Sequence, residues 1–290
     1  MRIGRKQKGK GIWWFAFLIE TPAGWQYFTR YEKGKMNMAN KQPSVMDLLI
    51  ETHEGLERQG PGSPEMTRKA LDFLDNLDQI SHAADLGCGS GGQTMVLAQH
   101  LTGAIIGLDL FPDFIHVLNE NAQKQNIEDQ VKGVVGSMDD LPFEKEAFDL
   151  IWSEGAIDNI GFEKGLAHWH GFLKKNGYIV VSCPSWLTKE RPAVIEKFWS
   201  DAGSGLDSIE HNVEALQKCG YQFIASFTLP ETCWTDNYFI PREAALKGLL
   251  KKYPGNETVE AFVAENRDEV ELYAKYKQYY GYVFYIGKKI

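Results

Sequence analysis

The sequence predicts an α/β fold in which helices cover both faces of a mostly parallel sheet. Short apolar runs alternate along the chain with stretches whose apolar residues recur at helical spacing, which is typical of strand–helix–strand units. A glycine-rich segment, 87–92, directly follows the first predicted strand, and a carboxylate, Asp109, ends the second. Because ligands bind beyond the carboxyl ends of the strands in such sheets, these two features predict a binding site there.

The individual elements follow from apolar spacing and from end signals. An amphipathic helix is expected from Pro43 to about Gly60, and another after Ser63, a suitable N-cap that precedes Pro64. The expected strands are His82–Leu86, Ala104–Asp109, Val131–Val135, Asp149–Ser153, Tyr178–Cys183, Tyr221–Leu229 and Tyr280–Ile286. The later helices are expected at Thr94–Leu101, Phe114–Ala122, Glu163–Leu173, Ile195–Trp199 and Ser208–Cys219.

The last two strands lie about fifty residues apart, too far for a hairpin turn. We therefore interpret residues 231–279 as a helical cap inserted between these strands. Residues 39–60 and 184–205 are expected to add to the cap. Residues 39–290 would then form a single domain.

The glycine-rich segment fits two classes of nucleoside ligand. Gly87, Gly89 and Gly92 match the dinucleotide fingerprint, whereas Gly87, Gly89 and Gly91, with Asp85 two residues ahead, match the pattern of S-adenosylmethionine enzymes. The carboxylate favours the second class, because it suits a ligand with an ammonium and a sulfonium better than a diphosphate. An NAD(P)-dependent oxidoreductase and a non-catalytic S-adenosylmethionine-binding protein stay open as alternatives.

Residues 80–185 resemble a class I S-adenosylmethionine-dependent methyltransferase, of the small-molecule type grouped with the ubiquinone/menaquinone methyltransferases. The matching segments are 85–91, 107–109, 136–143, 148–152 and 173–178. The resemblance implies a Rossmann-like sheet of seven strands whose last strand is antiparallel. It also implies transfer of a methyl group from S-adenosylmethionine to a small-molecule acceptor by in-line displacement, with S-adenosylhomocysteine as product.

The same resemblance assigns the cofactor contacts. It implies that the glycine turn contacts the methionine part of the cofactor and that the acid at the end of the second strand binds the ribose hydroxyls. The residue after that acid and the loop after the third strand would contact the adenine. The residues concerned are Asp85, Gly87, Gly89, Gly91, Asp109, Leu110, Ser137, Met138 and Asp139. Relatives often carry Asp where this chain has Ser137, so the adenine contact is expected from the serine hydroxyl, Asp139 or the backbone.

The loop after the fourth strand lies beside the reactive sulfonium in that family. Glu154 and Asp158 are therefore the candidates for positioning the acceptor. Methyl transfer mainly requires alignment and exclusion of water, and it needs a general base only where the acceptor arrives protonated. For Glu154 the alternative is a structural role, as a helix cap or as the partner of a lysine.

Aromatic residues after the fifth and sixth strands are candidates for the acceptor pocket. They are Trp186, Trp234 and Tyr238. Aromatic walls fit a hydrophobic acceptor and also attract a sulfonium by cation–π contact. The alternative is that these side chains pack helix against helix as ordinary core.

Composition narrows the class of partner. The net charge of −8 and the lack of a dense basic run after residue 10 argue against a nucleic-acid substrate. The four cysteines are scattered without metal-ligand spacing, so we expect reduced thiols, no metal and a cytoplasmic location. Spanning a membrane needs about 20 consecutive apolar residues, and no such run occurs, so no membrane partner is expected. The oligomeric state has no signal in the sequence.

Residues 1–38 combine a basic start with the apolar run 12–19, which is similar to a signal peptide. An enzyme that uses S-adenosylmethionine needs the cytosolic pool of this cofactor, however. We therefore interpret these residues as an N-terminal extension, non-native or mis-assigned, with the start at Met36 or Met38. A chain that lacks residues 1–35 is expected to keep its activity, and loss of soluble, cofactor-binding protein would contradict this interpretation.

Overall fold

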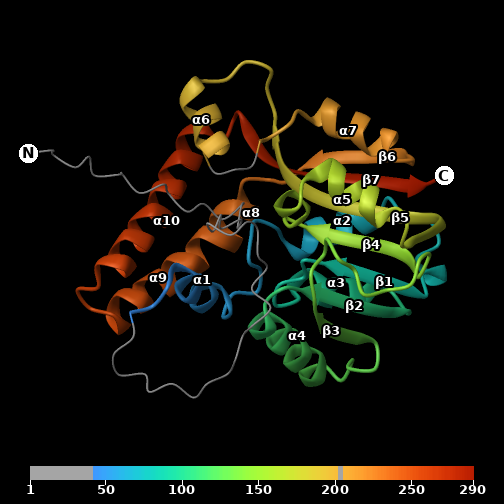
Figure 1. Cartoon of the computed structure of the whole chain (residues 1–290), viewed down its shortest axis with the longest axis horizontal. Helices are drawn as coiled ribbons and strands as arrows, with labels where there is room; N and C mark the ends of the chain where they lie inside the picture. The colour runs from blue at the N-terminus through green and yellow to red at the C-terminus, as the bar shows by residue number, and fades with distance from the viewer. Residues whose placement is uncertain (1–41, 202–204) are drawn as a thin grey trace, which may run out of the picture.

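The computed structural model describes residues 42–201 and 205–290, so the expectations for residues 1–38 lie outside it. Seven strands form one sheet in the order β3-β2-β1-β4-β5-β7-β6 (Figure 1). β1 to β5 run parallel, and β7 pairs antiparallel with both β5 and β6. The strands are β1 His82–Leu86, β2 Ala104–Asp109, β3 Val131–Val135, β4 Phe148–Glu154, β5 Leu173–Trp186, β6 Tyr221–Thr228 and β7 Tyr280–Lys289. The predicted fold class is confirmed.

Helices pack on both faces of the sheet, and their bounds follow the apolar spacing. The longer helices are α1 Val45–His53, α2 Pro64–Leu71, α3 Gly92–His100, α4 Pro112–Lys124, α5 Phe162–Trp169, α6 Ala193–Asp201, α7 Ile209–Lys218, α9 Ile240–Lys252 and α10 Glu257–Tyr276. The short turns are η1 Leu77–Gln79, η2 Ile157–Asn159, α8 Thr232–Trp234 and the π-helical η3 Thr235–Phe239. One core cluster contains Leu71, Leu97 and Leu118 from α2, α3 and α4, and another contains Leu166 and Leu216 from α5 and α7.

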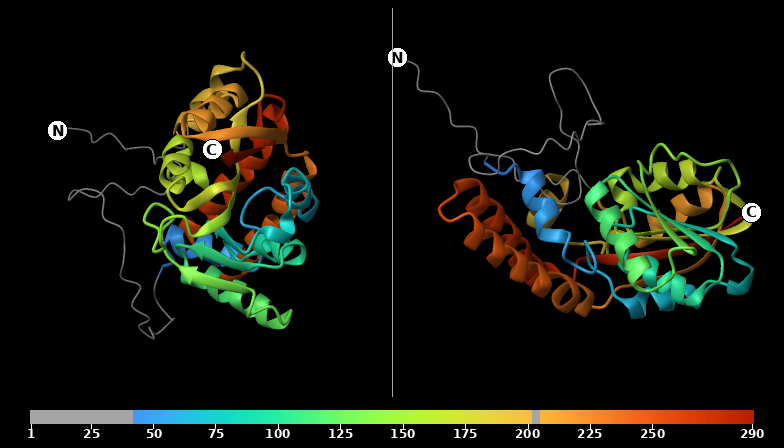
Figure 2. Two further views of the ribbon diagram at one scale, coloured as in Figure 1. Left: turned by 90° about the vertical axis from the view of Figure 1, so that its right-hand side faces the viewer. Right: turned by 90° about the horizontal axis from the view of Figure 1, so that it is seen from below.

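Helices α1, α9 and α10 lie together at one end of the sheet, the end opposite the C-terminus (Figures 1 and 2). Because β7 is antiparallel, this is the end at which the parallel strands finish. A separate apolar cluster joins the three helices, with Leu48 and Leu49 packed among Leu246, Leu249 and Phe262. The helical layer therefore stands over the carboxyl ends of the strands, where a ligand site is expected.

The π-helical turn η3 has a local cause in the sequence. Pro241 has no backbone N–H to donate to the carbonyl of Asn237, so the regular hydrogen-bond ladder cannot continue through this point. The chain widens into η3 before α9 begins at Ile240. Such turns are frequent at functional sites, and this one carries Tyr238.

A buried ion pair joins α9 to α10. Arg242 Nη1 lies 2.7 Å from Glu269 Oε2, and the two side chains are only 1% and 8% exposed. The guanidinium also donates to the hydroxyl of Tyr238 at 2.8 Å and to the backbone carbonyl of Asn266 at 3.1 Å. The network thus fixes both helices and the hydroxyl of one tyrosine.

Two helices end earlier than predicted. α1 stops at His53 instead of near Gly60, because residues 54–60 leave the helix and hydrogen-bond to the glycine turn. α5 stops at Trp169, because β5 begins at Leu173 and pairs with Phe148 of β4. In the part of the chain that the structure describes, no helix is both long and apolar enough to cross a membrane.

Candidate active site

The glycine turn leads from β1 into α3 with left-handed backbone conformations at Gly87 and Gly89. A Cβ on Gly87 would lie 2.4 Å from that of Ala156, and one on Gly89 would lie 1.9 Å from Oε1 of Gln59. A side chain at either position would thus clash with a neighbouring loop as well as strain the backbone. Glycine is required here for a turn that two other segments approach closely.

A cavity of about 490 Å³ lies beside this turn, and we call it the main cavity. It is formed by the loops that follow β1, β2, β3 and β4, together with residues from α1 and β7. The predicted site residues that line it are Gly87, Gly89, Asp109, Leu110, Ser137, Met138, Asp139, Glu154, Asp158 and Tyr238. The topology therefore brings most of the predicted positions to one space.

Asp109 ties the glycine turn to the start of α4. Its Oδ2 accepts a hydrogen bond from the backbone N–H of Gly89 at 2.9 Å, and its Oδ1 accepts one from Phe111 at 3.0 Å. Burial raises the pKa of this carboxyl, and the two N–H groups act in the opposite direction. Since a carboxylate has about four acceptor sites, each oxygen keeps capacity for a further donor in the main cavity.

The loop after β3 closes the neighbouring side of the main cavity. Ser137 donates its hydroxyl to Asp139, and the backbone carbonyl of Met138 accepts a hydrogen bond from the indole of Trp169 at 2.7 Å. Leu110 is 55% exposed although it lines the cavity. An exposed leucine beside polar groups offers an apolar surface to a flat ring.

Asp85 and Gly91 do not line the main cavity, so their contact with a ligand stays a prediction. The carboxylate of Asp85 is fully buried, and it accepts hydrogen bonds from Thr94 at 2.6 Å and Gln93 at 3.3 Å. Burial raises its pKa to about 7. Gly91 caps α3 and faces Leu118. Asp85 thus contacts α3, and Gly91 packs against α4.

Glu154 has the structural role that the sequence left open, but its partner is an arginine. Its Oε2 lies 2.7 Å from Nη1 of Arg58. Its Oε1 accepts from the Thr67 hydroxyl at 2.7 Å and from the Trp152 indole at 2.9 Å. With both oxygens occupied, this carboxylate is a wall of the main cavity and is not placed to accept a proton from a substrate.

Asp158 is the contrasting carboxyl of the same loop. It sits in η2, and both of its oxygens are buried without a hydrogen-bond partner among the described residues. Burial raises its pKa to about 7. A carboxyl that titrates near neutral pH and has open acceptor sites is suited to general acid–base chemistry.

The predicted aromatic wall is only partly present. Trp186 and Trp234 are buried in the core, Trp186 against Tyr280 and Trp234 stacked on Tyr273 with ring centres 4.4 Å apart. Neither lines the main cavity, which favours the core-packing alternative for both. Tyr238, which lies in η3, does line the main cavity.

The lining residues that the sequence did not single out include Arg58, Gln59 and Tyr282. Gln59 Nε2 donates to the Ser90 hydroxyl at 2.7 Å, and its Oε1 accepts from the backbone N–H of Ser90 at 2.9 Å. These hydrogen bonds hold the segment after α1 against the glycine turn. Two polar residues in a predicted helix and a tyrosine in an apolar strand carry no local signal of this role.

Comparison with known proteins finds a family match in the central part of the chain. Residues 84–181 match the family model described as a methyltransferase domain. A chloroplastic tocopherol O-methyltransferase of Arabidopsis thaliana is 29% identical over 182 residues, which cover 60% of this chain and 47% of that protein. The chain thus spans about half the length of this relative.

Solved structures extend the likeness to the whole fold. The cyclase SpnF superposes with a TM-score of 0.68 at 17% identity, covering 84% of this chain and 93% of that one. Geranyl diphosphate C-methyltransferase from Streptomyces coelicolor A3(2), solved with Mg²⁺, geranyl diphosphate and S-adenosyl-L-homocysteine, gives a TM-score of 0.55 at 18% identity, covering 78% and 79%. Because one fold serves different activities, these likenesses establish the architecture alone.

Proposed function

We propose that the chain is an S-adenosylmethionine-dependent enzyme that methylates a small molecule, from the premise that residues 84–181 match the family model of a methyltransferase domain. The observation that carries the proposal is the main cavity, in which the glycine turn, Asp109 and Asp158 meet. The similarity to a tocopherol O-methyltransferase supports a small-molecule acceptor.

The residues that line the main cavity fit S-adenosylmethionine. Asp109 would hold the ribose, since each of its oxygens keeps an open acceptor site. Leu110 and Met138 would pack on the adenine, and Ser137 and Asp139 would meet its edge. Gly87 and Gly89 would let the methionine part lie against the backbone.

When bound, S-adenosylmethionine supplies a methyl group on a cationic sulfur that is already a good leaving group. The chain must therefore align the acceptor, exclude water and remove a proton from an acceptor that arrives protonated. Tyr238 and Tyr282 wall the space next to Asp158. Asp158 would accept the proton of the acceptor, because Glu154 is already hydrogen-bonded to Arg58, Thr67 and Trp152.

Calorimetry with two ligands tests the proposal directly. We expect S-adenosylhomocysteine to bind the full chain and NADH not to bind. NADH binding without S-adenosylhomocysteine binding would instead favour an oxidoreductase. Transfer of labelled methyl groups to a metabolite extract then separates an enzyme from a protein that only binds the cofactor.

We expect Asp109→Ala to weaken S-adenosylhomocysteine binding by about 1.5–3 kcal/mol, the range for hydrogen bonds to a charged group. The physical reason is the loss of both acceptor oxygens that face the ribose. Calorimetry measures the change, and Asp129→Ala, an exposed site in the loop between α4 and β3, is the control. Equal affinity of the wild type and Asp109→Ala would contradict the ribose assignment.

The rate of methyl transfer is expected to rise with pH and to level off above a pH of about 7. The sign follows from the chemistry, because Asp158 accepts a proton only after losing its own, and burial raises its pKa. The Cys183 thiol and the Tyr282 phenol beside it have pKa values well above their ordinary values, so neither titrates in this range. A pH profile of kcat measures the effect, and a flat profile between pH 5 and 9 would exclude Asp158 as the base.

A further inference from the structure

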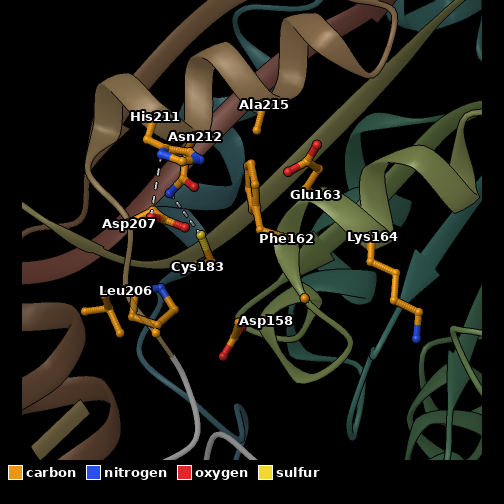
Figure 3. A pocket seen from close by; sticks show the side chains of 13 residues that line it. Asp158, Phe162, Glu163, Lys164, Cys183, Leu206, Asp207, His211, Asn212 and Ala215 are labelled. Atoms are coloured by element: carbon orange, nitrogen blue, oxygen red, sulfur yellow. Dashed lines mark hydrogen bonds and ion pairs between the residues drawn. The ribbon is translucent and has the colours of Figure 1, made fainter. Parts of the chain in front are cut away.

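A second cavity, of about 300 Å³, adjoins the main cavity. It lies between α5, α7 and the end of β5 (Figure 3). Asp158, Gly161 and Lys164 line both cavities, so they form a common wall. A molecule in the second cavity would therefore meet the contents of the main cavity at Asp158.

The lining of the second cavity carries an excess of carboxyl groups. Asp158, Glu163 and Asp207 are acidic, whereas Lys164 is the lysine among the described lining residues. His211 lies 3.7 Å from Asp207, and both of these side chains are more than half exposed at the rim. Figure 3 shows Asp158 across the cavity from His211. This charge distribution favours a cation and disfavours an anion.

The carboxyl group at the common wall, that of Asp158, has oxygens left unsatisfied by the described residues. Both oxygens of Asp158 are buried without a hydrogen-bond partner in the described part of the chain. A buried carboxylate without a partner is unfavourable, and a cationic hydrogen-bond donor removes most of that cost. An ammonium group supplies several such donors at once.

Apart from the buried amide of Asn212, the remaining wall of the second cavity is largely apolar. Phe162 stands on α5, Ala215 on α7, and Leu206 on the segment before α7 (Figure 3). Leu206 and Ala215 are buried, so they offer an apolar surface rather than polar groups. A ligand that fits has a charged nitrogen at one end and a hydrocarbon body at the other.

We propose that the second cavity binds the methyl acceptor, and that this acceptor is a protonated primary or secondary amine with an apolar body. The inference deepens the proposed function and rests on it. The nitrogen lies against Asp158 at the common wall, and the body extends between Phe162 and Ala215. Methyl transfer then takes place where the two cavities meet.

The chemistry of such an acceptor requires a base at this position. An ammonium nitrogen has no lone pair, so it first gives one proton to the Asp158 carboxylate. The nitrogen then forms a bond to the methyl carbon while the carbon–sulfur bond breaks, and that electron pair leaves with the sulfur. The product nitrogen carries the positive charge, the sulfur becomes a neutral thioether, and Asp158 returns its proton to solvent.

Three probes that differ in charge test the inference: benzylamine, benzyl alcohol and benzoate. Each is titrated calorimetrically into the full chain saturated with S-adenosylhomocysteine. We expect benzylamine to bind most tightly and benzoate not to bind. Asp158→Asn should weaken benzylamine binding by about 10- to 100-fold, the range for a charge-assisted hydrogen bond, and leave benzyl alcohol unaffected. Asp129→Asn, an exposed substitution of the same kind, should change nothing.

A second variant tests where the body of the ligand lies. Ala215→Phe fills the second cavity from α7 and should abolish binding of both benzylamine and benzyl alcohol. Retained S-adenosylhomocysteine affinity shows that each variant is folded. Benzylamine binding no tighter than that of benzyl alcohol, or unchanged in Asp158→Asn, would overturn the inference while leaving the proposed function intact. Failure of the wild type to bind S-adenosylhomocysteine would overturn the proposed function itself.

Discussion

Asp158→Asn is expected to lower kcat by about 10²- to 10⁴-fold, the usual contribution of a general base. The amide keeps the size of the side chain but cannot take up the proton. The fold should tolerate the change, because the substitution removes a buried carboxyl whose oxygens have no hydrogen-bond partner in the described part of the chain. We therefore expect unchanged S-adenosylhomocysteine affinity and a melting temperature no lower than that of the wild type.

The measurement is the transfer of isotope-labelled methyl groups to an acceptor found in a metabolite extract. Asp140→Asn is the matched control, since Asp140 is an exposed aspartate in the loop after β3 and lines neither cavity. Wild-type turnover by Asp158→Asn would remove the base from the mechanism. Loss of turnover in both variants would point to a nonspecific effect of removing charge.

Glu269→Ala is expected to reduce the free energy of unfolding by about 3–5 kcal/mol, because it leaves a buried guanidinium without its counter-charge. Arg242 is 1% exposed in its side chain and cannot reach water without moving α9. The remaining acceptors of its hydrogen bonds, the Tyr238 hydroxyl and the Asn266 carbonyl, offer neutral oxygens only. Chemical denaturation followed by circular dichroism measures the loss.

Glu243→Ala is the control for this effect. Glu243 lies on the same helix, α9, and pairs with Arg267, but these two side chains are 33% and 46% exposed. A surface pair of this kind contributes about 0–1 kcal/mol, so the control should remain close to the wild type in stability. Similar losses in Glu243→Ala and Glu269→Ala would show that burial of the pair is not what matters.

The strands were predictable because apolar runs and glycine turns are local features. β1, β2 and β3 begin and end where the sequence indicates, and Gly87, Gly89 and Asp109 meet at the sheet edge as expected. Helix ends were less predictable. α1 ends at His53 instead of near Gly60, and Gln59 hydrogen-bonds to Ser90, thirty-one residues further on, as well as to the carbonyls of His53 and Leu56.

Among the candidate residues, the sequence could not separate Glu154 from Asp158. Both follow β4, and both are carboxyls in one loop. Arg58 and Thr67, which occupy Glu154, come from a distant part of the chain, while no described side chain reaches the oxygens of Asp158. The sequence also could not separate Trp234 from Tyr238, four residues further on. Both belong to the same core cluster, but of the two Tyr238 alone also lines the main cavity.

The sequence by itself determined the fold class, the glycine turn and the acid that follows it, because each depends on the order of neighbouring residues. The tertiary structure alone decided which carboxyl has oxygens without a hydrogen-bond partner among the described residues, which aromatic side chain lines the main cavity, and that a second cavity opens at Asp158. Those properties depend on burial and on partners supplied by segments far apart in the chain, and no local pattern encodes them.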